Sequence, residues 1–272
     1  MRHDPAGTAY RLEGEGRSGA PVVLVHGVGL DQGMWAAQRD ALAPLGPLLS
    51  YDMLGHGRTP ARPGDAGLAD FRDQLAQLLS HLSVKRCRLV GFSMGSLVAR
   101  AFATRWPERV ARLALLNTLV YPEMSWAVVA FVLAARLPGL RSLLTSSWGL
   151  KKALQVGVVD GRRITAEVVQ GVQEPFRDRD ARRALAKAGC NVSPKGIREL
   201  AERLPEFGGP VRILYGERDR ILPDVARTMA RVKRDLPQAE VTSLADCGHF
   251  LQEERPEEIG QQLGAFFSGP SR

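Results

Sequence analysis

The chain has 272 residues, of which 44% are hydrophobic and 24% are charged, and its 37 basic and 29 acidic residues give a net charge of +8. This composition is typical of globular proteins and excludes a disordered chain, while the length excludes a small scaffold that needs disulfides or metals to fold. The charge alone would fit nucleic-acid binding. However, no run of Arg and Lys is interleaved with aromatic residues, so we expect no nucleic-acid partner.

The cysteines and the apolar segments predict a protein of the cytoplasm. Cys87, Cys190 and Cys247 are far apart and fit neither a disulfide framework nor metal-ligand spacing, which favours buried thiols in a reducing compartment. The N-terminal segment has no apolar core like that of a signal peptide. The longest apolar run, 127–135, is too short to span a bilayer, so we expect no membrane partner.

In the first half of the chain, short β-like runs alternate with helix-like segments. Strands are predicted at 21–25, 48–51, 88–91 and 110–116, and helices at 33–45, 68–82 and 94–106. This alternation predicts βαβ units and a parallel sheet. The near-continuous apolar runs suit strands that are covered on both faces.

The alternation is interrupted in the middle of the chain. From about 120 to 204 the strand signal disappears, and helices are predicted at 126–137, 142–156, 163–174, 178–189 and 194–203. Strands at 211–215 and 240–244 and helices at 223–235 and 256–267 then resume the first pattern. We therefore expect one α/β core, residues 1–119 and 205–272, interrupted by a helical cap at 120–204.

A G-x-S-x-G motif, Gly91 to Gly95, lies between a predicted strand and a predicted helix. A sharp turn from strand to helix forces the central residue into a strained backbone conformation, and side chains two positions away would collide there. The turn raises the hydroxyl of Ser93 above the sheet edge, at the N-terminus of a helix. Ser93 is therefore the candidate nucleophile. The alternative is a small-residue turn that only tightens the packing of helix on sheet.

A serine nucleophile needs a general base and a carboxylate that orients the base. His249 follows the last predicted strand, so its loop opens onto the same sheet edge as Ser93. Asp219 follows the strand that ends at 215; its rival Glu217 stands next to Gly216 and is expected to be a turn residue. The order Ser93, Asp219, His249 is one of the known orders of such triads, and the ends of parallel strands share one edge.

The turn after the first strong strand, 26–29, is expected to help stabilise an oxyanion. A tetrahedral intermediate needs two N–H donors, and the backbone N–H groups of Val28 and Met94 are the candidates. His26 is expected to fix this turn by hydrogen bonding. The next strand is followed by a tight loop in which Asp52 is expected to accept backbone N–H groups.

No motif in the chain predicts a metal or a cofactor. The histidines near the first two strands have no metal-ligand spacing. Gly14-Glu-Gly16 lacks the further glycine and the helix start of a dinucleotide site.

Taken together, these motifs resemble the α/β-hydrolase superfamily. The resemblance is carried by His26-Gly27, 52–59, Gly91 to Gly95, 216–219 and 247–249, and it covers about residues 10–118 and 206–268. It implies the α/β-hydrolase fold, a mostly parallel twisted sheet flanked by helices, with a helical cap that lies over the triad and forms most of the substrate pocket. The spacing of Asp31, Met34-Trp35 and Gln38 is similar to that of the enol-lactonase and carboxylesterase branch.

Two features depart from the pattern of that family. Members often have a second glycine after the elbow, where this chain has Ser96, and the cap at 120–204 has no motif that we can assign to a known cap. The serine at the elbow argues against the dehalogenase and epoxide-hydrolase branches, which use a carboxylate nucleophile.

The leading hypothesis is a cofactor-independent serine hydrolase that cleaves a carboxylic ester or lactone through an acyl-enzyme. One alternative is hydrolysis of a carbon–carbon bond in ring-cleavage products, although those relatives usually have a Ser-Gly-Pro-Gly-type loop where this chain has Val28-Gly29-Leu30-Asp31. The other alternative is a non-catalytic ligand-binding protein that keeps the fold.

The cap contains most of the net positive charge, because its 14 Lys and Arg against 8 Asp and Glu between 120 and 204 give +6 of the total +8. The stretch 177–183 is expected to be a solvated helix face; the alternative is an electrostatic funnel for an anionic substrate. The apolar helix at 127–137, with Trp126 before it and Trp148 beyond it, fits a helix that covers an apolar acyl or ring system; the alternative is that it only packs on its neighbours. In both cases we expect a small, largely apolar substrate. No sequence feature indicates an oligomeric state.

Overall fold

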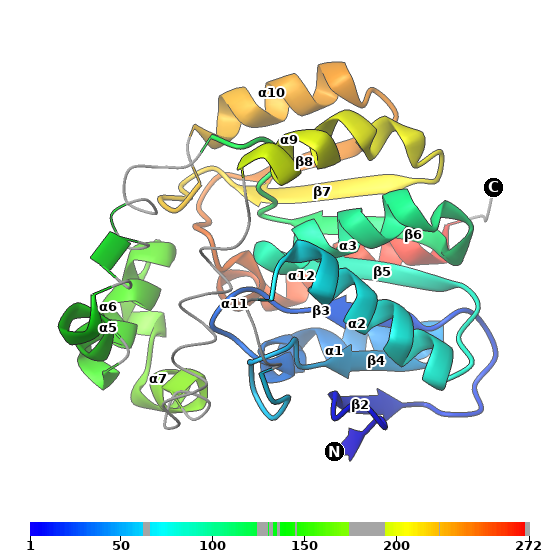
Figure 1. Ribbon diagram of the computed structural model, residues 1–272. Coiled ribbons are helices and arrows are strands. Elements are labelled where there is room, and N and C mark those ends of the chain that lie inside the picture. The colour runs from blue at the N-terminus through cyan, green and yellow to red at the C-terminus, as the bar shows by residue number, and fades with distance from the viewer. Residues whose placement is uncertain are drawn as a thin grey trace.

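The computed structural model describes residues 1–61, 66–123, 130, 133–134, 137–144, 146–173, 194–222 and 224–269. Within them, one sheet has the strand order β1-β2-β4-β3-β5-β6-β7-β8 (Figure 1). The strands are β1 (Arg2–His3), β2 (Ala9–Glu13), β3 (Val22–Val25), β4 (Leu48–Tyr51), β5 (Cys87–Phe92), β6 (Val110–Leu116), β7 (Val211–Gly216) and β8 (Glu240–Leu244). From β4 to β8 all pairs are parallel, whereas β1 and β2 are antiparallel at one edge.

Helices cover both faces of this sheet and bury two apolar layers. One face packs against α2 (Leu68–His81), α3 (Met94–Arg105) and α10 (Val225–Asp235); the other packs against α1 (Arg39–Leu42), α11 (Leu251–Glu254) and α12 (Pro256–Ser268). All of β3 is buried because its alternate side chains point to opposite layers. This mostly parallel, helix-flanked sheet confirms the predicted fold class.

Short 3-10 helices complete the described core. They are η1 (Gln32–Gln38), η2 (Ala43–Leu45), η3 (Pro107–Arg109) and η6 (Leu204–Glu206). The single helix predicted at 33–45 is wrong, since η1, α1 and η2 share that stretch. One reason is Pro44, which has no N–H to continue an α-helix.

The sequence missed β1 and β2. β2 lies toward the partly exposed edge of the sheet, where Arg11 and Glu13 interrupt the apolar pattern of a buried strand.

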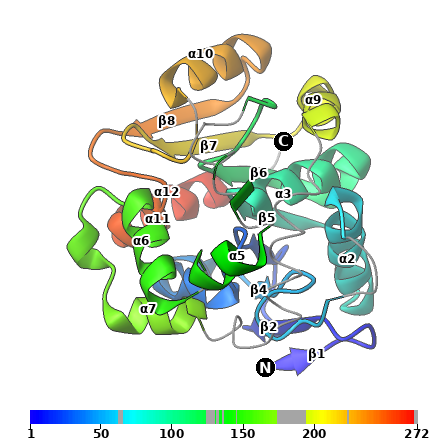
Figure 2. The same cartoon turned by 60° about the vertical axis from the view of Figure 1, so that its left-hand side comes forward.

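Between β6 and β7 the described helices are α5 (Pro138–Leu144), α6 (Ser147–Gly157), η4 (Gly161–Arg163), α7 (Ala166–Gln173) and α9 (Pro194–Arg203). In Figure 1, α5, α6 and α7 form a group beside the layered part of the molecule, and Figure 2 brings this group forward. The group has an apolar cluster of its own, made by Leu150, Leu154, Val158, Ile164 and Val169.

Helix α9, in contrast, lies on the core. Its Leu200 packs against Leu97 and Ala101 of α3, and Arg203 donates to the carbonyl of Thr104. The cap boundaries at 120 and 204 stay a prediction. The helix at 178–189, most of the helix at 126–137, and the charged stretch 177–183 lie outside the described residues. None of the described helices combines the length and the apolarity needed to cross a membrane.

Candidate active site

Ser93 occupies the sharp turn between β5 and α3. Its φ of 51° and ψ of −118° are sparsely populated for a residue with a side chain. A Cβ atom on Gly91 would lie 2.6 Å from the Cα of Ser96, and one on Gly95 would collide with the carbonyl oxygens of Val25 and His26. Both glycines of the motif are therefore required sterically, because a helix and two strands meet here without room for side chains.

Hydrogen bonds hold this strained backbone in place. The N–H of Ser93 donates to the carbonyl of Leu116 in β6 over 3.0 Å. The hydroxyl of Ser96 donates to the carbonyl of Ser93 over 2.5 Å and lies 2.7 Å from the hydroxyl of Thr118. Ser96, at which the chain departs from the family pattern, is thus fully buried, and its hydroxyl fixes the turn. A glycine has no side chain that could make these hydrogen bonds.

The structure brings Ser93, His249 and Asp219 together. Nε2 of His249 lies 3.0 Å from Oγ of Ser93, and Nδ1 of His249 lies 2.7 Å from Oδ2 of Asp219. The other oxygen of Asp219 accepts the N–H groups of Ile221 and Leu222. Both side chains are almost completely buried. Because a carboxylate oxygen accepts hydrogen bonds, Nδ1 donates to Asp219, which leaves Nε2 facing the Ser93 hydroxyl as an acceptor.

The turn that contains Val28 lies beside Ser93. A Cβ atom on Gly27 would be 3.4 Å from the Cβ of Ser93 and 2.8 Å from the Phe92 ring. Met94 is the first residue of α3, where N–H groups have no partner within the helix. Among the described residues, neither the N–H of Val28 nor that of Met94 has an acceptor, so both donors are available to a bound oxyanion.

His26 fixes this turn and Asp52 accepts backbone N–H groups around its own loop, as the sequence predicted. Nδ1 of His26 donates to the carbonyl of Gly27, and Nε2 accepts the N–H of Met53. The carboxylate of Asp52 accepts the N–H groups of Gln32 and Arg58. Both side chains are buried and hydrogen-bonded to the backbone of these loops.

Asn117 is the important residue that the sequence analysis missed. It follows β6, has a φ of 40°, and is completely buried. Its amide nitrogen lies within hydrogen-bond distance of the carbonyls of Gly248 and His249, while its side-chain oxygen accepts the N–H of Gly216. One carboxamide thus ties together the loops that contain His249 and Asp219. A polar residue directly after a predicted strand is the signal that could have found it.

Aromatic rings surround the imidazole of His249. Phe92 and Phe250 have ring centroids 5.1 and 5.4 Å from that of His249.

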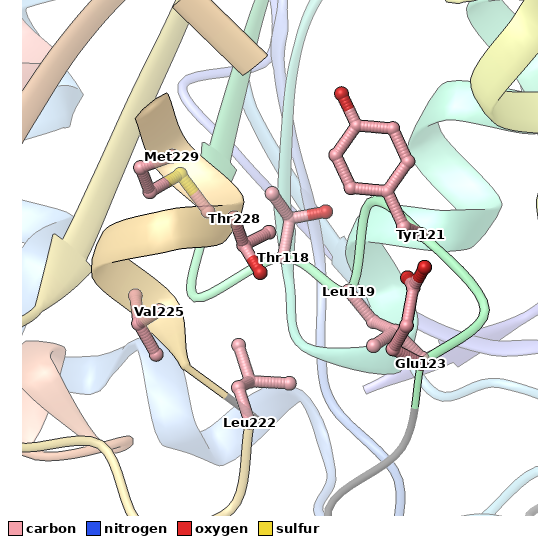
Figure 3. A pocket seen from close by; sticks show the side chains of 8 residues that line it. All are labelled: Thr118, Leu119, Tyr121, Glu123, Leu222, Val225, Thr228 and Met229. Carbon is pink, nitrogen blue, oxygen red and sulfur yellow. The ribbon is translucent and has the colours of Figure 1, made fainter. Parts of the chain in front are cut away.

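The pocket in Figure 3 lies between the segment after β6 and the start of α10, with Thr118 and Leu222 among its lining residues. At about 10 Å³ it holds roughly one water molecule, so it is too small for an organic substrate.

Two of the three cysteines are buried and free. Burial raises the pKa of Cys247 to about 11 and that of Cys87 to about 12, so both stay protonated thiols at neutral pH. Cys190 lies outside the described residues. Among the described residues, no group of three or more His, Cys, Asp or Glu is placed to hold a metal ion.

The sequence profile of the alpha/beta hydrolase family matches residues 22–262. The chain belongs to the α/β-hydrolase family. The match includes every strand from β3 to β8 and the turn with Ser93, and it supports a hydrolase.

Two curated relatives are each 30% identical to this α/β-hydrolase. One is a 2-hydroxy-6-oxononadienedioate/2-hydroxy-6-oxononatrienedioate hydrolase of Paraburkholderia phymatum, matched over 93% of this chain and 88% of the relative. The other is a dihydrolipoyllysine-residue acetyltransferase component of an acetoin cleaving system from Pseudomonas putida, matched over 94% of this chain. The chain spans 65% of the length of that second relative.

Solved structures agree with this fold. A thermophilic esterase from Thermogutta terrifontis is 28% identical, with a TM-score of 0.73 over 94% of this chain and 91% of the other. An enol-lactonase from Burkholderia xenovorans is 24% identical, with a TM-score of 0.80 over 96% of each chain, a likeness that shows the fold alone.

The contacts of Asn117 predict that Asn117→Asp impairs the site. An aspartate can still accept the N–H of Gly216, but its second oxygen would repel the two carbonyls that the amide nitrogen now contacts. We expect kcat/KM on a short nitrophenyl ester to fall about 10- to 100-fold and the free energy of unfolding to fall by about 2 kcal/mol. Gln261→Glu, which adds the same charge on an exposed face of α12, serves as the control. Wild-type kinetics in Asn117→Asp would contradict this assignment.

The buried histidines predict a loss of stability in mild acid. Burial lowers the pKa of His26 to about 4 and that of His56 to about 3, from an ordinary value of 6.5. As the pH falls from about 6.5 toward 4, the unfolded chain binds protons that the folded protein excludes, so the free energy of unfolding decreases. Each histidine contributes up to about 1.4 kcal/mol per pH unit in this window.

Urea unfolding at several pH values between 7 and 4 measures this slope. His56→Asn should make the slope shallower, whereas His81→Asn, at an exposed helix end, should leave it unchanged. Equal slopes in all three proteins would show that His56 does not titrate in this way.

Proposed function

We propose that the chain is a serine hydrolase that cleaves a carboxylic ester or lactone through an acyl-enzyme, with Ser93, His249 and Asp219 as its catalytic triad. The observation that supports this most strongly is the continuous chain of hydrogen bonds from Oγ of Ser93 through His249 to Asp219, with distances of 3.0 and 2.7 Å. The strained backbone of Ser93 adds to it, since strain of this kind persists at sites where it serves function.

In the acylation step, Oγ of Ser93 attacks the carbonyl carbon of the substrate. Nε2 of His249 takes the hydroxyl proton, and Asp219 stabilises the imidazolium and holds its orientation. The N–H groups of Val28 and Met94 stabilise the oxyanion that forms. When the tetrahedral intermediate collapses, the bond from carbon to the leaving oxygen breaks, and His249 returns the proton to that oxygen.

Deacylation repeats these steps with water. His249 removes a proton from the water, whose oxygen bonds to the acyl carbon, and then returns the proton to Oγ of Ser93 as the acyl bond breaks. The product is a carboxylic acid, or a hydroxy acid or keto acid from a lactone. The apolar rings of Phe92 and Phe250 around His249 favour a small, largely apolar substrate.

The first experiment replaces the nucleophile. In Ser93→Ala we expect kcat on short nitrophenyl esters to fall at least about 1,000-fold, because both steps need the hydroxyl. Ser80→Ala removes an exposed hydroxyl from α2 and serves as the matched control. A fluorophosphonate probe should label the wild type at Ser93. No labelling, together with ligand binding, would favour the non-catalytic alternative.

A second candidate is hydrolysis of a carbon–carbon bond in a ring-cleavage product. It is favoured by the 30% identity to a relative named as a 2-hydroxy-6-oxononadienedioate hydrolase. The same triad could serve both reactions, so the two functions differ in the substrate that reaches Ser93. The loop Val28-Gly29-Leu30-Asp31 favours the ester reaction, because carbon–carbon hydrolases of this family usually have a Ser-Gly-Pro-Gly-type loop here.

Comparing two substrate panels on one preparation separates these candidates. We expect kcat/KM for the best ester or lactone to exceed that for chromogenic dienone acids at least tenfold. The opposite ranking, with Ser93→Ala inactive on the dienone, would establish the second candidate instead.

A further inference from the structure

The loop that contains His249 is hydrogen-bonded to the C-terminal end of α6. The carbonyl of Gly157 accepts the N–H of His249 over 2.6 Å and that of Phe250 over 3.3 Å. Gly157 ends α6, one of the helices inserted between β6 and β7. Two consecutive backbone donors of the His249 loop therefore depend on an acceptor from the inserted region.

Glu254 makes a second connection between the same two segments. One carboxylate oxygen accepts the N–H of Gly248 over 2.6 Å, and the other accepts the N–H of Val159 over 2.7 Å. Glu254 is only 4% exposed, and among the described residues it has no ion-pair partner. Burying a carboxylate costs free energy unless hydrogen bonds stabilise its charge. The N–H groups of Gly248 and Val159 supply these hydrogen bonds to Glu254.

Close packing leaves no space between the two segments. A Cβ atom on Gly157 would collide with the Phe250 ring, and one on Gly248 would collide with the carbonyl of Gly157. Phe250 also packs against the core cluster under α11 and α12 and against the cluster of α6 and α7. The ring next to His249 in sequence thus joins the apolar interior of the core to that of the inserted helices.

The backbone of residues 248–250 is constrained from two sides. Its carbonyls, at Gly248 and His249, contact the amide nitrogen of Asn117, which comes from the sheet. Its N–H groups, at 248, 249 and 250, donate to Glu254 and to the carbonyl of Gly157. The loop has no regular secondary structure, so these side-chain and long-range bonds replace the pairing that a strand or helix would supply.

From these contacts we infer that Glu254 is a positioning residue for His249, and that the segment 157–159 of the inserted region forms part of the frame that fixes the general base. This inference rests on the proposed function of His249. It gives the inserted region a role besides shaping the substrate pocket, because a displacement of 157–159 would move the imidazole relative to Oγ of Ser93. Displacements of about 1 Å can cost roughly 100-fold in rate.

Glu254→Gln tests the inference with the smallest change in shape. A glutamine has only one acceptor oxygen, and its NH₂ group would face one of the two N–H donors that the carboxylate now accepts. We expect kcat and the rate of Ser93 labelling by a fluorophosphonate to fall about 10- to 100-fold, with KM changed less than twofold, since Glu254 is buried and acts through the His249 loop.

Two control variants separate a positioning role of Glu254 from the effect of losing one negative charge and from a general loss of protein stability. Glu253→Gln removes the same charge one residue away, from an exposed side chain. Leu78→Val lowers the stability at α2, in the apolar layer that contains neither Cys247 nor Phe250. Both should keep wild-type kcat and labelling rate when these are expressed per folded molecule.

Hydrogen–deuterium exchange supplies a readout that needs no activity. The N–H groups at 248–250 should exchange at least tenfold faster in Glu254→Gln than in the wild type and in Glu253→Gln. Unchanged exchange, or faster exchange with unchanged Ser93 labelling, would overturn the inference. A wild type that reacts with no probe and hydrolyses no ester would overturn the proposed function instead, and the exchange rates would still decide whether Glu254 holds the loop.

Discussion

The strained backbone of Ser93 is the constraint on which the site depends. A positive φ at a residue with a side chain is unfavourable, and it persists here because the surroundings leave no alternative. Gly91 and Gly95 allow β5, α3 and the end of β3 to approach at backbone distance, and the hydroxyl of Ser96 holds the carbonyl of the turn. The strain on one residue is therefore offset by hydrogen bonds and burial across several elements. As a result, Oγ lies at the sheet edge, next to the N–H groups of Val28 and Met94, which have no acceptor among the residues that the structure describes.

The parallel sheet places three loops at this edge but does not fix their conformation. Strands stop where the pairing stops, and beyond that point each loop needs partners of its own for its buried polar groups. His26 and Asp52 meet this need around the turn of Val28. Asn117 meets it between the loops of Asp219 and His249. Each of these side chains is buried, and each bonds mainly to backbone, so they specify where the loops lie without taking part in the chemistry.

The sequence predicted the features that local chemistry determines. The strands from β3 to β8 were predicted within one or two residues because buried parallel strands form continuous apolar runs. Ser93, Asp219 and His249 were chosen as candidates because each follows such a strand, and the structure brings them into hydrogen-bond contact. Asn117 and Glu254 were missed because their partners are distant: Asn117 bonds to residues 99 to 132 positions away, and Glu254 to one 95 positions away. The position of Asn117 directly after a predicted strand was a signal, but it did not show which loops the side chain would join. Glu254 has no local signal that distinguishes it from an ordinary helical glutamate.

Because the His249 loop is hydrogen-bonded to the region inserted between β6 and β7, the conformation of this loop and that of the inserted segment depend on each other. The helices α6 and α7 have their own apolar cluster, so their outer surfaces can change without affecting the sheet. The segment 157–159 has no such freedom, since its backbone groups are partners of the His249 loop and of Glu254. An insertion adapted to another substrate must therefore preserve the path of these three residues. Gly157 is the most constrained of them, because any side chain there would displace Phe250 and, with it, the loop that holds the imidazole.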